Sequence, residues 1–403
     1  MAKLKLHSSK LIMLIISFAF LEPTFISHMS GFFWNGVHNV FLLLKIVAIL
    51  IGLLMLAYSK GTDKYVIVSS ILFGFLIIND LIHSSGGTVR TVYFCMSEIA
   101  MVGTIKYYYS KNTLERFVSI FKSVLAVLII LNLVFLIIRP NGLFRSELYN
   151  SLNVGADGHF FGYKNNHVYF FIPYTVLSYM QLMDSLKDKI RFWIMHIVII
   201  STLVLIKAST ALILYVLVTA GIIFFPVAKR IKPQWILISS ILISYLLIMS
   251  TYLSRSVAFI ASLFSKGVTL SGRLTVWNRG IQAFLMHPIV GTGIGTTPLN
   301  INYQQYHNKY LDFMVCGGIV LLLIFILYMI ICCRKVDSYN NRMRVIGVLC
   351  LVSYCIMFIM EGTRTELFFW LIMSICYYHK DDIRDIGLIR KKYKLKEKRT
   401  INV

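Results

Sequence analysis

Residues 310–331 read YLDFMVCGGIVLLLIFILYMII, a continuous apolar run with one acidic residue and no basic one. A helix of this length crosses the hydrocarbon core of a bilayer, which is about 30 Å thick. Lipid requires a helix here, because backbone polar groups find no partner outside the segment. Similar runs recur along the 403-residue chain, which is 58% hydrophobic and only 14% charged. A soluble domain carries about a quarter charged residues, so the sequence predicts an all-α polytopic membrane protein.

The apolar runs predict twelve membrane-spanning helices, which form one integral membrane domain over residues 1–403. Their expected bounds are 11–27, 39–58, 65–83, 91–109, 118–138, 166–183, 192–207, 210–227, 235–252, 310–331, 345–361 and 365–379. The first run follows three lysines, as a secretory signal peptide would. It lacks a small-residue cleavage pattern and contains Glu22-Pro23, so we interpret it as the first span.

Lysine and arginine are distributed between the loops as the positive-inside rule requires. With the N-terminus in the cytoplasm, every inner segment is basic, and more than two thirds of the 40 cations lie on the inner side. We therefore expect both termini to be cytoplasmic, with a basic tail over residues 380–403 near anionic lipid. The net charge of +23 follows from these segments, so it does not indicate a nucleic-acid partner.

Two of the expected outer loops are long, at residues 139–165 and 253–309. A loop as long as 253–309 on a compact scaffold is usually functional or disordered, and this loop is not of low complexity. Within it, residues 273–286 have the spacing of an amphipathic helix. Its apolar face consists of Leu274, Trp277, Ile281, Phe284 and Leu285. Ser271 is placed to cap this helix and Pro288 to end it. We expect the helix to lie in the membrane interface, with Trp277 at headgroup depth.

The same loop continues with three spaced glycines, Gly291, Gly293 and Gly295. A GxGxG pattern is found in phosphate-binding loops, but here no strand precedes it and no Walker lysine follows it. We therefore expect a tight loop with exposed backbone at the membrane surface and no nucleotide site.

Several of these motifs together resemble the O-antigen ligase and polymerase superfamily, which includes capsule and exopolysaccharide repeat-unit polymerases. The resemblance is carried by Ser271-Gly272-Arg273 with Trp277, by His287-Pro288 and the glycines after it, by His307-Asn308 with Tyr310-Leu311, and by Gly317-Gly318. Two further elements are Gly162-Tyr163-Lys164-Asn165-Asn166 and Ala208-Ser209-Thr210-Ala211-Leu212. Many relatives carry an arginine where this chain has Ser209, and Lys207 would supply that charge here.

The resemblance implies a bacterial cytoplasmic-membrane enzyme with a GT-C-like helical fold. It implies a metal-independent, inverting glycosyl transfer from an undecaprenyl-diphosphate-linked oligosaccharide, with no cofactor. The family's functional arginine and histidine correspond to Arg273 and His307. Flippase and chain-length regulator proteins are the partners that such a role implies, together with membrane lipids.

The residue types lead to the same chemistry independently. Breaking a sugar–diphosphate bond requires fixed cations for the developing charge, and the arginine fork binds two phosphate oxygens at once. The cations on the expected outer half are Lys45, Arg90, Arg139, Arg145, Lys164, Lys207, Arg255, Lys266, Arg273, Arg279, Lys309 and Arg364. From these we select Arg273 as catalytic and Lys164, Lys207, Arg279 and Arg364 as substrate-binding.

His307 is the expected general base for the acceptor hydroxyl, because an unperturbed histidine titrates near neutrality. His287 precedes a proline and is expected to end the helix instead. Asn308 and Tyr306 are expected to bind substrate beside His307. The acids within or beside spans are sugar ligands, ion-pair partners or, in a transporter, proton-relay groups; they are Glu22, Asp80, Glu98 and Asp312.

Three functions fit the sequence. The first is a repeat-unit polymerase, which transfers a growing glycan from its carrier to a new lipid-linked unit. The second is a ligase of the same superfamily with a lipid or protein acceptor. The third is a lipid-linked oligosaccharide flippase, which would show paired discontinuous helices or charges deep in several spans.

Overall fold

The structure is a computed structural model that describes residues 2–59, 61–83, 88–145, 157–183, 185–249, 273–294, 306–339, 342–360 and 367–379. Only the backbone is described for residues 2–8, 145, 249, 273–275 and 360.

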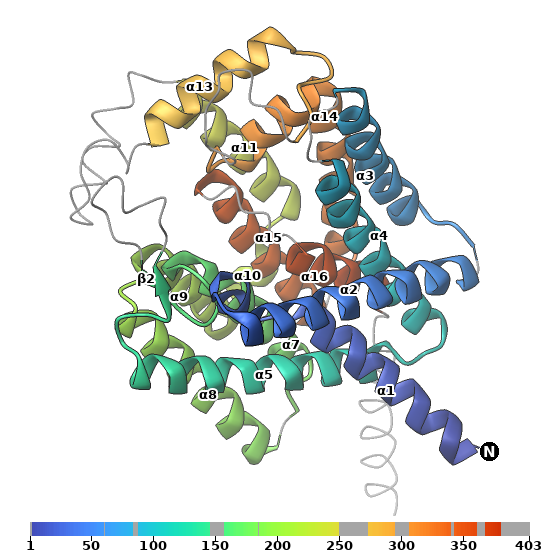
Figure 1. Ribbon diagram of the computed structural model, residues 1–403, viewed down its shortest axis with the longest axis vertical. Coiled ribbons are helices and arrows are strands. Elements are labelled where there is room, and N and C mark those ends of the chain that lie inside the picture. The colour runs from blue at the N-terminus through green and yellow to red at the C-terminus, as the bar shows by residue number, and fades with distance from the viewer. Residues whose placement is uncertain are drawn as a thin grey trace, which may run out of the picture.

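These residues form fourteen α-helices (Figure 1). The helices are α1 (Ala2–Phe20), α2 (Phe32–Tyr58), α3 (Lys64–Ile82), α4 (Thr88–Ser110), α5 (Leu114–Ile138), α7 (Val168–Met180), α8 (Leu186–Leu205), α9 (Ser209–Ile223), α10 (Phe225–Arg230), α11 (Pro233–Met249), α13 (Arg273–Met286), α14 (Lys309–Asp337), α15 (Arg342–Met360) and α16 (Leu367–Tyr378). Two 3-10 helices, η1 (Thr24–His28) and η2 (Lys164–His167), precede α2 and α7. The loop at 139–165 contains one short antiparallel pair, β1 (Phe144–Arg145) and β2 (Asp157–Gly158).

The predicted all-α polytopic class is confirmed. Five helices in the described part are long and apolar enough to cross a membrane, namely α2, α3, α5, α14 and α15, and four shorter apolar segments accompany them. Each of the twelve predicted spans overlaps a helix, and α10 and α13 are the two additional ones. The predicted bounds of the first span, 11–27, were wrong: α1 ends at Phe20, because the chain turns at Glu22-Pro23 and continues as η1.

Side-chain caps determine where three of these helices begin. Asp63 accepts from the N–H of Val66 at the start of α3, and Ser185 caps α8 in the same way. Asn308 accepts from the N–H of Leu311 at the start of α14. Each cap satisfies one of the backbone donors that the first turn of a helix leaves without a partner.

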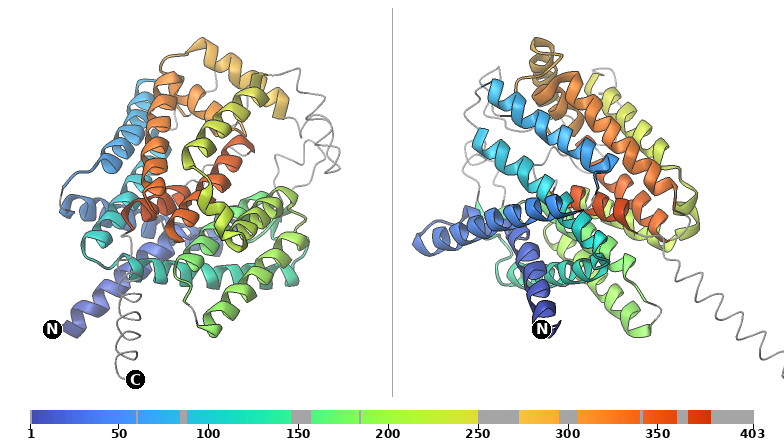
Figure 2. Two further views of the ribbon diagram at one scale, coloured as in Figure 1. Left: turned by 180° about the vertical axis from the view of Figure 1, so that it is seen from behind. Right: turned by 90° about the vertical axis from the view of Figure 1, so that its right-hand side faces the viewer.

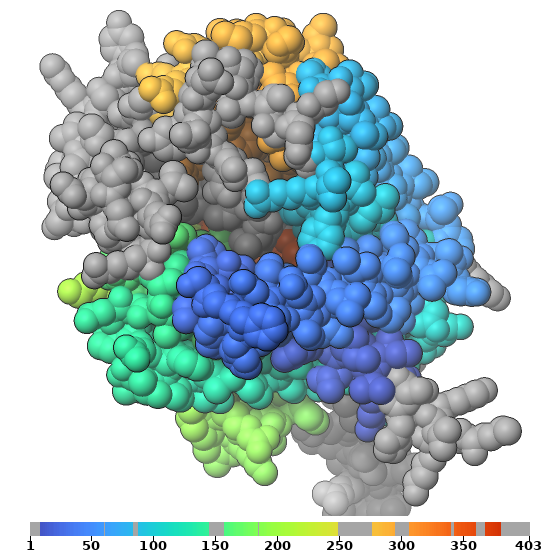
Figure 3. Space-filling model, viewed as in Figure 1, coloured from blue at the N-terminus to red at the C-terminus, as the bar shows by residue number. Residues whose placement is uncertain are grey.

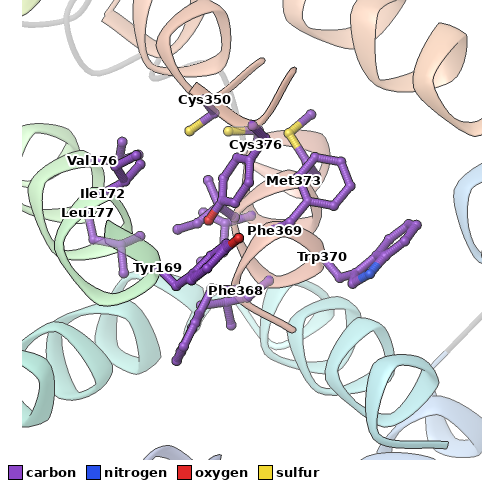
Figure 4. Close-up of a cluster of buried hydrophobic side chains, with 14 of the residues drawn as sticks. Tyr169, Ile172, Val176, Leu177, Cys350, Phe368, Phe369, Trp370, Met373 and Cys376 are labelled. Atoms are coloured by element: carbon purple, nitrogen blue, oxygen red, sulfur yellow. The ribbon is translucent and has the colours of Figure 1, made fainter. Parts of the chain in front are cut away.

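The last helix, α16, lies at the centre of the core. All its side chains from Phe368 to Cys376 are buried, and Figure 4 shows them packed between Tyr169 and Ile172 of α7 and Cys350 of α15. A helix that is apolar all round belongs in an interior, so the remaining helices are arranged around this one.

The segments predicted to lie on the cytoplasmic side meet at one end of the molecule. The hydroxyl of Tyr378 donates to Asp63 across 2.8 Å, and Asp63 also pairs with Lys106 at 3.5 Å. Arg342 donates to the carbonyl of Leu182. These contacts join the ends of α3, α4, α7, α15 and α16.

The segments predicted to lie on the outer side contact one another, away from the first group. The N–H of Phe25 in η1 donates to the carbonyl of Phe160, and the N–H of Ile294 donates to Asp80 at the end of α3. α13 lies at the top of the molecule in Figure 1, against α11 and the start of α14. From the side, α3, α14 and α11 lie next to one another (Figure 2). The alternation of loops predicted from charge is therefore matched by two separate groups of helix ends.

Candidate functional site

The helix predicted at 273–286 has those bounds in the structure, as α13. Trp277 is 1% exposed and packs with Tyr306, Leu311 and Val315. This face of α13 therefore packs on the protein, and the depth of the helix in the membrane stays a prediction. Leu285, assigned to the same apolar face, is 66% exposed.

Gly280 brings α13 close to α14. A Cβ atom at Gly280 would lie 2.7 Å from Cδ2 of Leu311, nearer than side-chain carbons approach one another. Arg279 is the neighbouring residue and is exposed. The backbone of Arg273 begins the same helix. α13 is thus held as a rigid carrier of these two arginines against the first turn of α14.

The glycine loop after α13 is buried and docks into α14. The N–H groups of Thr292 and Gly293 donate to the carbonyls of Val315 and Cys316, each across 2.9 Å. The next N–H, that of Ile294, donates to Asp80. The predicted exposed backbone was wrong, and these three donors are already used within the protein. The loop therefore joins structural elements and does not hold a phosphate through these groups.

α14 is interrupted where the loop enters. Gly318 has φ +63° and ψ −162°, which is not helical, and glycine alone adopts such a conformation without strain. The N–H groups of Ile319 and Val320 donate to the carbonyls of Pro288 and Ile289. In an unbroken helix these N–H groups would bond the carbonyls four residues earlier. The loop thus replaces one turn of hydrogen bonds within α14.

His307 lies at the start of α14, partly buried, with φ +49°. A positive φ is uncommon outside glycine. Among the described residues only Asn112, Lys207 and His307 have it without being glycine, so two of the three are predicted site residues. Backbone held in such a region often marks a functional site.

Asn308, predicted to bind substrate, has every hydrogen-bonding group of its amide in use. Its Nδ2 donates to Ser244 at 2.8 Å and to the carbonyl of Ile359 at 3.1 Å. Its Oδ1 accepts from Ser244 and from the N–H of Leu311. An asparagine amide offers two donors and two acceptor sites. Asn308 therefore fixes the position of His307 by joining α11, α14 and α15.

Tyr306 is buried beside α13, and its N–H donates to Asp312 at 2.9 Å. Its hydroxyl has no hydrogen-bond partner among the described residues. Burial raises the pKa of Tyr306 above its usual value, and nearby Cys316 and Asp312 add to this shift. The phenol is therefore a neutral donor at physiological pH.

Lys164 begins η2, which contacts α9, and Lys207 lies two residues before α9 begins. Both side chains are exposed. Lys164 is close enough to His159 that burial and this cation together lower the pKa of His159, against the opposing effect of Asp157. No hydrogen bond or ion pair within the described residues joins this pair to α13. Arg364 lies outside the described residues, as does the side chain of Arg273.

A cavity of about 350 Å³ lies between α2, α4 and α16. Its charged lining residues are Glu22, Lys45, Arg90 and Glu98, and Ile294 of the glycine loop forms part of its wall. In Figure 3 the surface is hollowed between the blue and cyan segments that contain α2 and α4. The cavity therefore borders the loop that connects α13 to α14.

Residues 195–326 match a family described as O-antigen ligase. This segment is similar to that family, and we refer to it as the O-antigen ligase domain after the family that it resembles. No curated protein matches the chain at a significant level.

The O-antigen ligase domain runs from within α8 to within α14. It contains six of the predicted site residues, which are Lys207, Arg273, Arg279, Tyr306, His307 and Asn308. It therefore includes α13, the docked glycine loop and the interrupted helix. Lys164 and Arg364 lie outside it.

The cavity next to the O-antigen ligase domain was not selected as a site from sequence. Glu22 and Glu98 were recognised as costly charges in apolar surroundings, and Lys45 and Arg90 as outer cations. No spacing relation connects them, because the cavity is formed by residues from distant parts of the chain. The signal that could have found it is the pairing of rare intramembrane acids with equally rare cations.

Proposed function

We propose that this protein is a polysaccharide repeat-unit polymerase on the outer face of the bacterial cytoplasmic membrane. It transfers a growing glycan from its undecaprenyl-diphosphate carrier to a sugar hydroxyl of a new lipid-linked unit. The observation that carries the proposal is the O-antigen ligase domain at 195–326, in which α13 packs directly against the helix that His307 precedes.

The reaction is a displacement at the anomeric carbon of the donor sugar. The acceptor oxygen forms the new glycosidic bond on one face while the bond to the diphosphate oxygen breaks on the other, which inverts the configuration. The acceptor proton goes to His307, and the diphosphate leaves on its polyprenyl chain. The leaving group is good enough that neutralising its charge is the main requirement, and the proposed transfer uses no metal ion.

Cations on two elements serve that requirement. Arg273 is the proposed catalytic arginine, and the exposed Arg279 follows it on α13. Lys164 and Lys207 form the second group, and Arg364 is assigned to the same role. Tyr306 and Asn308 are assigned to positioning: Asn308 by its saturated amide, and Tyr306 by its packing against Gly280.

The proposed topology has twelve spans, both termini in the cytoplasm and the segment 253–309 outside, in a GT-C-like arrangement. It is supported by the two separate groups of helix ends and by the basic inner segments. The group that contains Asp63, Lys106 and Arg342 would then face the cytoplasm.

The second candidate is a ligase, which is favoured by the name of the matching family, O-antigen ligase. The donor chemistry is the same in both, and only the acceptor differs. A flippase is less well supported, because among the described helices the single interruption in α14 is closed by the glycine loop instead of lining a path.

The test is elongation by the purified full-length protein in lipid nanodiscs, supplied with single lipid-linked repeat units. A ladder of products supports a polymerase, whereas transfer only to a separate lipid or protein acceptor supports a ligase. Arg273→Ala and His307→Ala should each abolish the ladder at normal protein levels. Lys111→Ala is the matched control, since Lys111 is an exposed cation in the other group of helix ends. Unchanged ladders from both site variants would exclude the proposal.

A further inference from the structure

The cavity between α2, α4 and α16 has a charge balance that suits a neutral ligand. Glu22 and Glu98 balance Lys45 and Arg90 among the residues that line it. Its volume of about 350 Å³ is within the usual size range for small-molecule sites. We propose that this cavity binds the terminal sugar of the acceptor glycan, an inference that rests on the proposed function.

Glu22 is held in place for such a role. One carboxylate oxygen accepts from His38 at 2.9 Å and the other from Lys45 at 2.5 Å, and the side chain is 7% exposed. A carboxylate has about four acceptor positions, so two remain for hydroxyl donors. A fixed, buried carboxylate binds sugar hydroxyls through charge-assisted hydrogen bonds, which are stronger than neutral ones.

Glu98 supplies a second carboxylate, on α4. It is fully buried and lines the cavity. Phe94, one helical turn before Glu98, also lines the cavity, as do Tyr93 and Ser97 of the same helix. Two carboxylates from different elements can contact different hydroxyl groups of one ring, which gives the site selectivity for sugar stereochemistry.

Aromatic rings form most of the remaining wall. Phe20, Phe94, Phe170 and Phe368 come from α1, α4, α7 and α16. The C–H faces of a sugar ring are apolar and pack on aromatic rings, while its hydroxyls point to polar groups at the edge. The combination of aromatic walls and buried carboxylates therefore fits a sugar better than it fits a lipid chain.

The carrier diphosphate does not fit this cavity. Lys45 is already neutralised by Glu22, and a diphosphate here would also face the buried carboxylate of Glu98. Like charges brought together in one site of low dielectric repel strongly. With Lys45 paired to Glu22, the exposed Arg90 would be the one lining cation left to face both the diphosphate and the carboxylate of Glu98.

The cavity is adjacent to the proposed reaction centre. Ile294 lines it, and the preceding residue Gly293 bonds the carbonyl of Cys316 in α14. A sugar in the cavity therefore lies beside the element that follows α13 and precedes His307.

The test is direct binding to the full-length protein in nanodiscs, with two probes. One is the phosphate-free repeat-unit oligosaccharide, released from the strain's own carrier by mild acid. The other is undecaprenyl diphosphate without sugar. Glu98→Gln and Glu22→Gln should weaken oligosaccharide binding roughly tenfold or more, as expected for loss of a hydrogen bond to a charged group, and leave carrier binding unchanged. Arg273→Ala should do the reverse.

Ser97→Leu is a second variant, which fills the cavity without removing a charge and should weaken oligosaccharide binding in the same way. Ser119→Leu on the exposed side of α5 is its control. Loss of carrier binding by the glutamate variants, or no oligosaccharide binding by the unaltered protein, would overturn the inference. The same preparation is assayed for elongation. If the protein elongates and every cavity variant still binds the oligosaccharide normally, the proposed sugar site is refuted and the proposed polymerase function is not. If oligosaccharide binding depends on the cavity residues but no elongation occurs, the proposed polymerase function is refuted and the sugar site is not.

Discussion

Gly280 of α13 lies against the ring of Tyr306, so that a Cβ atom on Gly280 would be 2.7 Å from Cδ1 of the tyrosine. This contact joins the helix that carries Arg273 and Arg279 to the segment that carries His307. The position of the two α13 arginines relative to the proposed base therefore depends in part on this close approach.

Gly280→Val should separate these two elements and slow elongation, roughly a hundredfold, which is the cost of a misplacement of about 1 Å at a reacting centre. The rate is measured with lipid-linked units in nanodiscs. Gly74→Val in α3 is the matched control, because a Cβ at Gly74 meets nothing within 4 Å. Equal rates for the two variants would mean that the contact does not position the site.

Gly318→Ala should destabilise the protein. A side chain in left-handed backbone costs about 1–2 kcal/mol, and a Cβ at Gly318 would also collide with the carbonyl of Ile289. Thermal unfolding in detergent can be followed with a thiol-reactive dye, because all seven cysteines are free and six of them are buried. The midpoint should fall by several degrees, whereas Gly74→Ala should leave it unchanged or raise it. A midpoint unaffected by Gly318→Ala would contradict the observed insertion of the loop.

His307→Asn should remove the base while keeping the backbone, because asparagine tolerates positive φ well. The elongation rate should fall by about 10²- to 10⁴-fold, the usual contribution of general base catalysis. Asn112→His is the reciprocal control, since Asn112 has φ +54° at the other group of helix ends. If the asparagine variant elongates normally with an unchanged unfolding midpoint, His307 is not the base.

Orientation can be tested with single cysteines at exposed cations. Arg279→Cys in α13 should react with a membrane-impermeant maleimide added to intact spheroplasts. Lys111→Cys should react only after the membrane is permeabilised. The unaltered protein is the background control, because its cysteines are largely buried. Labelling of position 111 from outside, or protection of position 279, would reverse the proposed topology.

Sequence predicted the helices well because membrane spans depend on local composition and length. The bounds of α13 followed from its amphipathic spacing and from Pro288. The end of α1 was misplaced because Thr24–His28 continue the apolar run as a 3-10 helix, which hydropathy does not distinguish from an α-helix. The burial of Trp277 was missed because periodicity identifies an apolar face and does not say whether protein or lipid covers it.

The site was predictable only in part. The segment around His307 and the helix at 273–286 could be selected from motifs. The docking of the glycine loop could not be predicted, because it is made by backbone hydrogen bonds and every residue type has the carbonyl groups that accept them. Asn308 was expected to contact substrate, and only the positions of Ser244 and Ile359 reveal that its amide is saturated. The charged cavity requires residues that are far apart in the chain, and no local pattern connects Glu22 with Glu98.

The hydrogen bonds that replace one turn of α14 come from the loop at Pro288–Gly293. The arginine-bearing helix, this loop and the histidine-bearing first half of α14 therefore share one continuous backbone frame. A bound glycan that displaces one of these three parts displaces them together. In the proposed polymerase, the separation between the backbone of Arg273 and that of His307 would then be the same in each round of transfer, however long the attached polymer has become.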